Sequence, residues 1–598
     1  MDFLSRVLTV IEDLREVPHY VRIGFALKRA QAGGFRTCGY LMREQAEKIP
    51  DRVLLRFEQE TVTYGAYNAG VNRYAAVVRG AGVRRGDAVA IMMENSPAFL
   101  TAEGAMAKLG TIGALINSHL RGEALAHVLR ASTARVVLAD VACLPGLREL
   151  GALEGFLVYA DVPPGELCGT PYRSLPEALD GASGAEPDIP DVKVSDVMMY
   201  IYTSGTTGYP KPTIIRHARF TMGGHALKII LGLQPGDCSY APTPLYHGYS
   251  NFVGFAPAFH NGSAFASRRR FSASHFLDDV QRHGVTHFMY VGELCRYLLR
   301  QPPDRRDRAH QIRVASGPGL RPDIWREFMQ RFGIPRIIET YGQTEANLSL
   351  MNSRGRIGSV GRSAPFTHRQ LKLVRFDFER QAPLRGRDGF LVECRPGEVG
   401  ELISVISRST TMSFDGYVSK ADNEAKILRD CFAKGDQYVR TGDLLRRDRA
   451  GYYYFVDRIG DTFRWKGENV ATAEVAELLN GAPGVSETAV YGVRVPGTEG
   501  RAGMALVVTY PGREFDPAAY YAHAERVLPG YARPLFVRLA QSMDVTGTLK
   551  HTKTRLQDEG YDPTRIGDPL YFRDDQARTY VPLDTALKRR IDDGEMAL

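Results

Sequence analysis

The stretch YIYTSGTTGYPKPT, from Tyr200 to Thr213, joins the end of an apolar run to a loop of glycine, serine and threonine. The run VMMYIYT has the composition of a strand that is covered on both faces. A glycine-rich loop after such a strand points backbone N–H groups at an anion, and a nearby lysine adds positive charge. The stretch therefore predicts a phosphate-binding loop. Its members are Thr203, Ser204, Gly205, Thr206, Thr207, Gly208 and Lys211.

This loop differs from the Walker type of phosphate loop. In the Walker pattern a lysine directly follows a glycine, whereas here Tyr209 and Pro210 separate Gly208 from Lys211. Glycine, serine, threonine and proline are also ordinary turn residues, so a surface turn stays open for the short string SGTTG alone. The full string over residues 203–211, directly after a strand, favours the phosphate loop.

Short apolar runs alternate with helical patterns from about residue 85 to residue 350, as in DAVAIMM followed by SPAFLTAEGAMAKLG. This alternation predicts an α/β fold with mainly parallel sheets flanked by helices. After Asp443 the pattern changes to short strands and amphipathic helices, which indicates a separate α+β domain. We therefore expect a large N-terminal domain over residues 1–457 and a small C-terminal domain over residues 458–598.

The composition limits the kinds of partner. The net charge of +8 is spread over 598 residues without a dense basic run, which argues against nucleic-acid binding but leaves a mild attraction to anionic membranes open. The seven cysteines contain no CxxC pair, so we expect no disulfide framework and a cytoplasmic location. We also expect no secretory signal and no transmembrane helix.

Five segments, in order, resemble the adenylate-forming superfamily, which includes acyl-CoA synthetases, peptide-synthetase adenylation domains and luciferases. They are YTSGTTGYPKPT, ETYGQTEAN (339–347), RTGDLL (440–445), VDRIGDTFRWKGENV (456–470) and TGTLKHTK (546–553). A narrower resemblance is to the fatty-acid transport proteins, a family of long- and very-long-chain fatty acyl-CoA synthetases. The segments that carry it are DRIGDTFRWKGENVAT, FDGYVSKADNEAKIL, GRAGMA and LKHTKTRLQDEGYDP.

The resemblance implies a ligase reaction in two steps. A fatty-acid carboxylate attacks the α-phosphorus of ATP, and the thiol of CoA then attacks the acyl-adenylate and releases AMP. Fatty acid, ATP and CoA are the implied substrates and Mg²⁺ the implied cofactor. A ligase for a steroid or bile-acid carboxylate stays open as an alternative, and so does a membrane-associated protein that takes up fatty acids by trapping them.

The resemblance also implies roles for single residues in adenylate formation. Gly317 and Tyr341 would lie against the adenine. Asp443 would accept hydrogen bonds from the ribose hydroxyls, and Arg458 would reach the ribose or the phosphates. Thr344 would lie near the α-phosphate, and Glu345 would bind Mg²⁺. The chain departs from the family pattern at Ala346, where glycine is common, and at SGPGL (316–320), where GNGL is common. These departures leave the chain-length preference open.

The C-terminal motifs imply a moving domain. Lys550 would bridge the carboxylate and the α-phosphate, with Lys553 as the rival assignment. Gly460 would be the hinge about which the small domain rotates. After rotation, Trp465, Lys466 and Gly467 would flank the tunnel for the CoA pantetheine.

Three histidines and the N-terminus complete the expectations. His247 in PLYHG is either part of the acyl pocket or a hydrogen-bonded core histidine. His283 and His287 have helical spacing, but their surroundings indicate a strand, and we predict no zinc site there. The first 35 residues form either an interfacial helix with peripheral membrane contact or a helix packed on the large domain, and the packed helix is favoured. A homodimer stays open.

Overall fold

The computed structural model describes most of the chain and divides it into two compact units. The described residues are 3–32, 36–151, 155–167, 170–188, 191–203, 209–346, 348–363, 370–378, 380–406, 414–466, 468–543, 553–596 and 598. The larger unit comprises Val7–Arg369 and Val405–Leu428, and the smaller unit comprises Met1–Arg6, Gln370–Ser404 and Arg429–Leu598. These units are defined by packing and not by motion, so the expected boundary at residues 457 and 458 stays a prediction.

The first sheet of the larger unit has eight strands in the order β15-β14-β13-β12-β10-β11-β1-β2. Its inner pairs are parallel, whereas β2 and β15 are antiparallel edge strands. The strands are β1 (Val53–Phe57), β2 (Glu60–Thr63), β10 (Cys238–Tyr240), β11 (Ala264–Ser267), β12 (His287–Met289), β13 (Val314–Gly317), β14 (Ile337–Gly342) and β15 (Ser349–Asn352).

The second sheet has seven strands in the order β7-β6-β5-β3-β4-β8-β9. All its pairs are parallel except the edge pair of β8 and β9, which is antiparallel. The strands are β3 (Ala88–Met92), β4 (Ile112–Leu115), β5 (Val136–Asp140), β6 (Leu157–Asp161), β7 (Arg173–Ser174), β8 (Val197–Thr203) and β9 (Lys211–Arg216). The apolar run VMMYIYT is thus a strand, as predicted.

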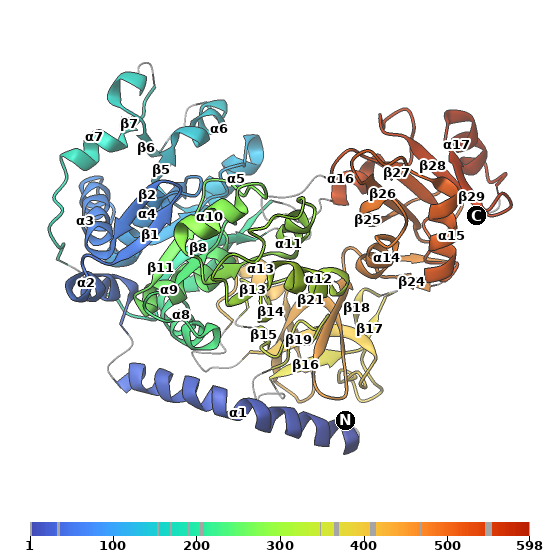
Figure 1. Ribbon diagram of the computed structural model, residues 1–598, viewed down its shortest axis with the longest axis horizontal. Coiled ribbons are helices and arrows are strands. Elements are labelled where there is room, and N and C mark those ends of the chain that lie inside the picture. The colour runs from blue at the N-terminus through green and yellow to red at the C-terminus, as the bar shows by residue number, and fades with distance from the viewer. Residues whose placement is uncertain are drawn as a thin grey trace. The chain divides into compact units, whose positions relative to one another are not determined.

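Helices flank both sheets (Figure 1). They are α1 (Phe3–Ala32), α2 (Cys38–Lys48), α3 (Tyr64–Gly80), α4 (Pro97–Leu109), α5 (Gly122–Ser132), α6 (Leu144–Glu149), α7 (Leu175–Asp180), α8 (His217–Leu231), α9 (Ala256–Asn261), α10 (Phe276–His283), α11 (Gly292–Leu299), α12 (Pro322–Phe332) and α13 (Lys420–Glu424). The Ser96 hydroxyl caps α4 by accepting from the N–H of Phe99, and Gly110 ends it in a left-handed conformation. From Phe99 to Leu109 this helix is buried in the core.

The smaller unit contains two five-stranded sheets and two short hairpins. The first sheet has the order β16-β19-β21-β20, with β22 paired to β21, and the second has the order β25-β26-β27-β28-β29. The strands of the first sheet are β16 (Leu371–Val374), β19 (Val399–Val405), β20 (Ile427–Arg429), β21 (Gln437–Arg447) and β22 (Tyr453–Arg458). Those of the second are β25 (Val485–Val493), β26 (Ala502–Thr509), β27 (Phe536–Leu539), β28 (Leu570–Asp574) and β29 (Thr579–Pro582). The hairpins are β17 (Phe376–Asp377) with β18 (Ala382–Pro383), and β23 (Phe463–Trp465) with β24 (Glu468–Val470).

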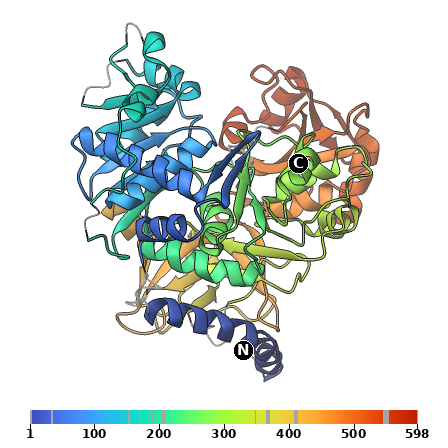
Figure 2. The same ribbon diagram turned by 60° about the vertical axis from the view of Figure 1, so that its left-hand side comes forward.

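Four helices complete the smaller unit (Figure 2). They are α14 (Thr472–Leu479), α15 (Pro517–Val527), α16 (Lys553–Glu559) and α17 (Thr585–Asp592). The predicted fold class, a large α/β part with mainly parallel sheets and a smaller C-terminal α+β part, is confirmed. Within the described part of the chain, no helix combines the length and the apolar composition that crossing a membrane requires.

Candidate active site

The predicted phosphate loop connects the two strands of an antiparallel pair. Thr203 is the last residue of β8, Lys211 is the first residue of β9, and the two face each other in the register. Ser204, Gly205, Thr206, Thr207 and Gly208 lie outside the described residues. The Lys211 ammonium lies 2.6 Å from Oδ1 of Asp422, a residue near the C-terminal end of the larger unit. The loop is therefore anchored at both ends, and its lysine is already held by a carboxylate.

A short segment from the end of the larger unit pairs with β9 and extends that edge of the sheet. The N–H of Ile214 donates to the carbonyl of Gly416 over 2.9 Å, and the N–H of Val418 donates to the carbonyl of Pro212 over 3.0 Å. Tyr417 thereby lies opposite Thr213 in an antiparallel bridge. The segment, residues 414–426, brings Tyr417, Asp422 and Lys426 into contact with Lys211 or Glu345. We call it the docking segment.

The Glu345 carboxylate lies within reach of this docking segment. Its Oε1 accepts hydrogen bonds from the Lys426 ammonium at 2.5 Å and from the Tyr417 hydroxyl at 3.1 Å. Glu345 is only 8% exposed, and this burial by itself would raise the pKa of its carboxyl. The charge and the hydrogen bond of Lys426 lower the pKa by more than burial raises it, so the pKa lies below its ordinary value. Glu345 is therefore ionised at neutral pH.

Arg219 on α8 holds the chain just before Glu345. Its guanidinium donates to the carbonyl of Thr344 and, over 3.1 Å, to the carbonyl of Gln343. It also lies 5.4 Å from the centre of the Phe252 ring. Burial lowers the pKa of Arg219 to about 10, so the side chain stays charged at neutral pH. No sequence motif points to this residue, and its only signal in the sequence is that it is the one arginine within α8.

Gly317 and Tyr341 lie on neighbouring parallel strands. Gly317 ends β13, and Tyr341 is half-buried on β14. A Cβ on Gly317 would lie 2.2 Å from Cδ2 of Tyr290, so packing against this ring already requires glycine there. A role of Gly317 against adenine stays a prediction, as does that of Tyr341.

A buried carboxyl on β14, that of Glu339, is a second feature that the sequence did not predict. Glu339 accepts from the hydroxyl of Tyr290 at 2.6 Å, from the N–H of Leu320 at 3.1 Å and from the N–H of Gly319. Burial raises the pKa of Glu339 to about 8 despite these hydrogen bonds. The contacts fix the SGPGL segment against β14, and this is the segment whose sequence departs from the family pattern.

The histidines fall into different environments. His247 is half-buried, with its ring 4.7 Å from that of Tyr246, and it precedes a π-helical turn, η3 (Ser250–Phe255). Such turns are frequent at functional sites. The place of His247 in an acyl pocket stays a prediction. His287 is buried on β12, where its two ring nitrogens lie 3.0 Å from Ser239 Oγ and 2.8 Å from Ser316 Oγ. Burial lowers the pKa of His287 to about 3, which is typical of a neutral core histidine.

Within the smaller unit, Asp443 on β21 faces Arg458 on β22 in the register of that pair. The Arg458 Nε lies 3.8 Å from Asp443 Oδ1, and the Asp443 N–H donates to the Thr441 hydroxyl at 3.2 Å. The two residues expected at the ribose are thus neighbours. Gly460 follows β22, and a Cβ placed on it would meet nothing within 4 Å. Close packing therefore does not explain this glycine.

Trp465 and Lys466, two of the residues expected at the CoA tunnel, lie in or beside the hairpin of β23 and β24. Trp465 is 4% exposed and belongs to the apolar core of the smaller unit. Lys466 has a positive φ of 52° at the turn and donates to the carbonyl of Leu598. Gly467 lies outside the described residues. Packing accounts for the burial of Trp465, and the tunnel role of these residues stays a prediction.

Lys553, the rival for the bridging lysine, is held inside the smaller unit. Its ammonium donates to the Thr472 hydroxyl at 2.6 Å and lies 3.6 Å from Oδ2 of Asp461. The neighbouring Asp457 is buried and accepts from the N–H of Thr472. Lys550 itself lies outside the described residues. Lys553 therefore joins the start of α16 to the segment around the expected hinge.

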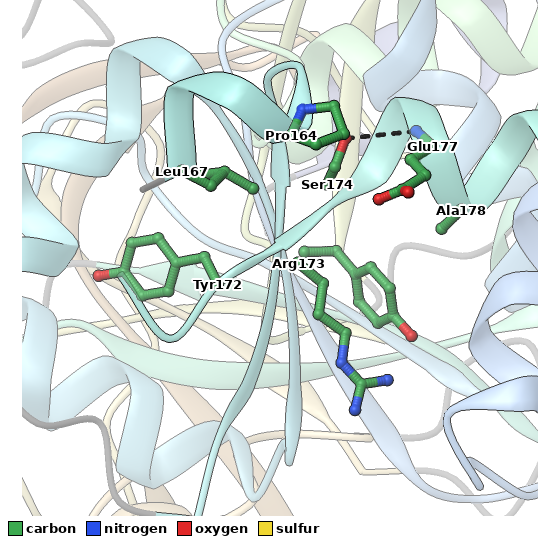
Figure 3. A pocket seen from close by; sticks show the side chains of 8 residues that line it. Pro164, Leu167, Tyr172, Arg173, Ser174, Glu177 and Ala178 are labelled. Atoms are coloured by element: carbon green, nitrogen blue, oxygen red, sulfur yellow. Dashed lines mark hydrogen bonds between the residues drawn. The ribbon is translucent and has the colours of Figure 1, made fainter. Parts of the chain in front are cut away.

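A cavity of about 530 Å³ opens elsewhere in the larger unit, beside the edge strand β7 (Figure 3). Figure 3 shows Leu167, Tyr172 and Arg173 around it, with the N–H of Glu177 donating to the Ser174 hydroxyl. None of the predicted site residues lines this cavity. It is therefore separate from the candidate site.

The donor atoms near Glu345 can be tested against the expected Mg²⁺. Among the described residues, no group of three or more histidine, cysteine, aspartate or glutamate side chains could hold a metal ion. Mg²⁺ in nucleotide enzymes is commonly held by one or two carboxylates together with phosphate oxygens and waters. A single ionised carboxylate at Glu345, beside the predicted phosphate loop, fits this mode of binding.

Comparison with known proteins identifies the family. The family model described as AMP-binding enzyme matches residues 42–417, and the model described as AMP-binding enzyme C-terminal domain matches residues 474–550. The chain belongs to the AMP-binding enzyme family. Within this family, the rat protein named long-chain fatty acid transport protein 2 is 40% identical over 579 residues, which cover 94% of this chain and 92% of that protein.

Two further relatives place the chain in the same branch of AMP-binding enzymes. The mouse long-chain fatty acid transport protein 1 is 38% identical, over 99% of this chain and 92% of that protein. The medium/long-chain-fatty-acid–CoA ligase FadD6 of Mycobacterium tuberculosis is 39% identical, over 97% of this chain and 95% of that protein. The resemblance to the adenylate-forming superfamily and to the fatty-acid transport protein family is confirmed.

Solved structures of AMP-binding enzymes confirm the fold. The anthranilate CoA ligase AuaEII in complex with anthranoyl-AMP has a TM-score of 0.74 at 21% identity, over 88% of this chain and 97% of that one. ATP-bound MatB from Rhodopseudomonas palustris has a TM-score of 0.73 at 23% identity, over 88% of this chain and 99% of that one. At these identities the likeness concerns the fold alone.

Proposed function

We propose that this protein is a fatty acyl-CoA synthetase, a long-chain-fatty-acid–CoA ligase that forms AMP and pyrophosphate. One observation carries the proposal. The docking segment binds Lys211 through Asp422 and binds Glu345 through Lys426 and Tyr417. One segment thus contacts both the lysine expected to bind phosphate and the carboxylate expected to bind Mg²⁺. The similarity to FadD6 over almost the whole chain supports a medium- or long-chain fatty acid as the acid that is activated.

In the first step a fatty-acid carboxylate would attack the α-phosphorus of ATP and displace pyrophosphate. Both reactants are anions, so the site must supply positive charge and N–H donors. The loop over residues 203–211 would hold the β- and γ-phosphates, and the Lys211 ammonium would exchange its bond to Asp422 for phosphate oxygens. Thr344, whose carbonyl Arg219 holds, would present its hydroxyl near the α-phosphate. Lys550 would contact both the attacking carboxylate and the α-phosphate.

Mg²⁺ belongs to this proposal. Glu345 would hold the ion, which when bound would offset negative charge on the phosphate oxygens. The Glu345 carboxylate is kept ionised by Lys426 and is positioned by the hydrogen bond from Tyr417. Both partners bind the same oxygen of this carboxylate, Oε1.

Further residues are proposed for adenosine recognition and for thioester formation. Gly317 and Tyr341 would contact the adenine, and the adjacent Asp443 and Arg458 would bind the ribose hydroxyls. In the second step the CoA thiol attacks the acyl carbon and AMP leaves. We infer that the small domain rotates about Gly460 between the two steps, as in hinge-type closure.

After that rotation, Trp465, Lys466 and Gly467 would flank the pantetheine arm of CoA. His247 would line the acyl pocket near the π-helical turn. A cytoplasmic location with peripheral contact to the inner face of the membrane, and a homodimer, are also part of the proposal. Sedimentation velocity of the purified chain tests the homodimer.

The function is tested with purified full-length protein, ATP, Mg²⁺, CoA and a panel of acids that contains octanoate, palmitate, tetracosanoate and cholate. We expect CoA-dependent thioester, detected by mass spectrometry, together with AMP and pyrophosphate from at least one fatty acid. A thioester from cholate alone would support the bile-acid alternative. No thioester from any acid of the panel would refute the ligase. Pyrophosphate release without CoA reports the adenylation step separately.

A further inference from the structure

Helix α1 exposes a concentration of large apolar side chains. They are Val7, Val10, Ile11, Leu14, Val21 and Phe25, with Leu14 61% and Phe25 71% exposed. In the described part of the chain, no other helix or strand exposes more than one large apolar side chain. An exposed apolar cluster of this kind is typical of an interaction surface.

These residues lie along one side of the helix. Val7, Ile11, Leu14, Val21 and Phe25 follow a spacing of three or four residues, which places them on a single stripe, with the exposed Pro18 between Leu14 and Val21. We call it the outer stripe. In both ribbon views α1 lies at the periphery of its unit, with one side turned away from the sheets (Figures 1 and 2).

The opposite side of α1 attaches the helix to the larger unit through acids. Asp13 and Arg362 are both buried, and their Oδ1 and Nη2 atoms lie 2.9 Å apart. The Ser353 hydroxyl donates to Glu16 at 3.3 Å, and Glu12 lies 3.9 Å from Arg354. A helix that covers an ordinary soluble core buries its apolar side and exposes its charges. Along this part of α1 the acids face inward and the outer stripe faces solvent.

This arrangement also determines the charge beside the outer stripe. Because Asp13, Glu16 and Glu12 face inward, the exposed charges of α1 among the described side chains are the cations Arg15, Arg22 and Lys28. The Arg15 side chain is 59% exposed although it also bonds to Glu12. Apolar side chains flanked by cations are complementary to the surface of an anionic bilayer. Against a second copy of the same helix, the same cations would repel one another.

We propose that the outer stripe of α1 docks this protein onto the surface of an anionic lipid bilayer, with the helix lying in the interface. Arg15, Arg22 and Lys28 would contact lipid phosphates while Leu14 and Phe25 enter the acyl region. The proposal deepens the peripheral membrane contact given above. It does not depend on the ligase chemistry, since lipid binding can be measured without substrates.

The test is sedimentation of the full chain with vesicles of phosphatidylcholine and phosphatidylglycerol, and with vesicles of phosphatidylcholine alone. The variant Leu14→Gln/Phe25→Gln should lose at least about tenfold in partitioning to the anionic vesicles. The control Val141→Gln/Leu478→Gln replaces two exposed apolar residues outside α1 and should bind like the wild type. Thermal melts and activity on octanoate, measured in parallel, show that each variant is folded.

Charge is tested with Arg22→Glu/Lys28→Glu, which should weaken binding to the anionic vesicles and leave any binding to neutral vesicles unchanged. Added salt should act in the same direction. The proposal is overturned if the wild type does not bind anionic vesicles, or if the Leu14→Gln/Phe25→Gln variant binds them as well as the control. Sedimentation velocity without lipid adds a further outcome, because a dimer that this variant dissociates would assign the outer stripe to a second copy instead.

Discussion

The Lys426 ammonium lies 2.5 Å from Oε1 of Glu345, although the two residues are far apart in the sequence. Burial alone would raise the pKa of this carboxyl, and the lysine reverses the direction of the shift. Lys426 therefore keeps the proposed Mg²⁺ ligand ionised in a site that excludes most solvent.

Replacing this lysine should change the pH dependence of adenylation. In Lys426→Met the burial of Glu345 is no longer offset, so its pKa rises and the carboxyl becomes protonated at higher pH. The acid limb of pyrophosphate release should then move upward by about one pH unit or more. Lys426→Arg retains the charge and should keep the profile near that of the wild type. An unchanged acid limb in Lys426→Met would contradict this account.

The two C-terminal lysines should behave differently. We expect Lys550→Ala to reduce pyrophosphate release at least about a hundredfold, because it removes the cation proposed to bridge the reacting anions. Lys553→Ala should reduce it far less, since the Lys553 ammonium is held by Thr472 and Asp461 within the smaller unit. Single-turnover pyrophosphate release compares the two variants. If Lys553→Ala has the larger effect, the assignment must be exchanged.

Trp465 should be important for stability whether or not it contacts CoA. Truncating this buried side chain in Trp465→Ala should destabilise the smaller unit by about 3 kcal/mol, through lost packing and the cavity left behind. Lys466→Ala, at the adjacent turn, should stay within about 0.5 kcal/mol of the wild type. Denaturant titration measures both variants. If the tunnel role is correct, Lys466→Ala should raise the KM for CoA without a matching loss of stability.

Glu103 on α4 should make the larger unit less stable as the pH rises. Its carboxyl is buried and accepts from the Asn251 amide at 2.6 Å, and burial raises its pKa to about 8. The folded chain therefore holds this proton above the pH at which the unfolded chain has released it. Between the ordinary pKa of a glutamate and about 8, stability should fall with rising pH, by up to about 1.4 kcal/mol per pH unit for this group.

The variant Glu103→Gln tests this directly, because glutamine keeps the shape and an acceptor for Asn251 but cannot ionise. Thermal melts at about pH 6, 7 and 8 should show the variant gaining stability over the wild type as the pH rises. Asn251→Leu is the complementary variant. It should destabilise the chain, since it removes the hydrogen bond to the buried carboxyl. A difference between Glu103→Gln and the wild type that does not change with pH would refute the prediction.

Local sequence patterns predicted much of the fold. The strands β8 and β3 were visible as short apolar runs, since a parallel sheet covered on both faces needs such residues. Helix α4 was visible as a helical pattern directly after the run DAVAIMM, and in the structure Ser96 and Gly110 cap its two ends. These signals lie within a few residues of one another, and the structure has the elements where the patterns place them.

The contacts of the candidate site could not be predicted in the same way. Arg219, Lys426 and Asp422 act on residues that are distant in the sequence, and no local pattern pairs them. The docking segment was visible only as part of a family resemblance, because its pairing with β9 uses backbone groups that carry no sequence signal. In α1 apolar residues lie on the buried side, as Ile23 does, and also in the outer stripe. The sequence therefore does not show which side of the helix, and with it which acids, is buried.

The hydrogen bonds from Arg219 to the carbonyls of Gln343 and Thr344 bear on the entropy that nucleotide binding would lose. A loop that becomes ordered only around its ligand loses conformational entropy at that moment, which weakens the affinity. Here the guanidinium already holds the backbone at Gln343 and Thr344 without a nucleotide, so part of this entropic loss would belong to folding and not to the binding of ATP. The stability of the protein and its affinity for ATP would thus be coupled through one side chain.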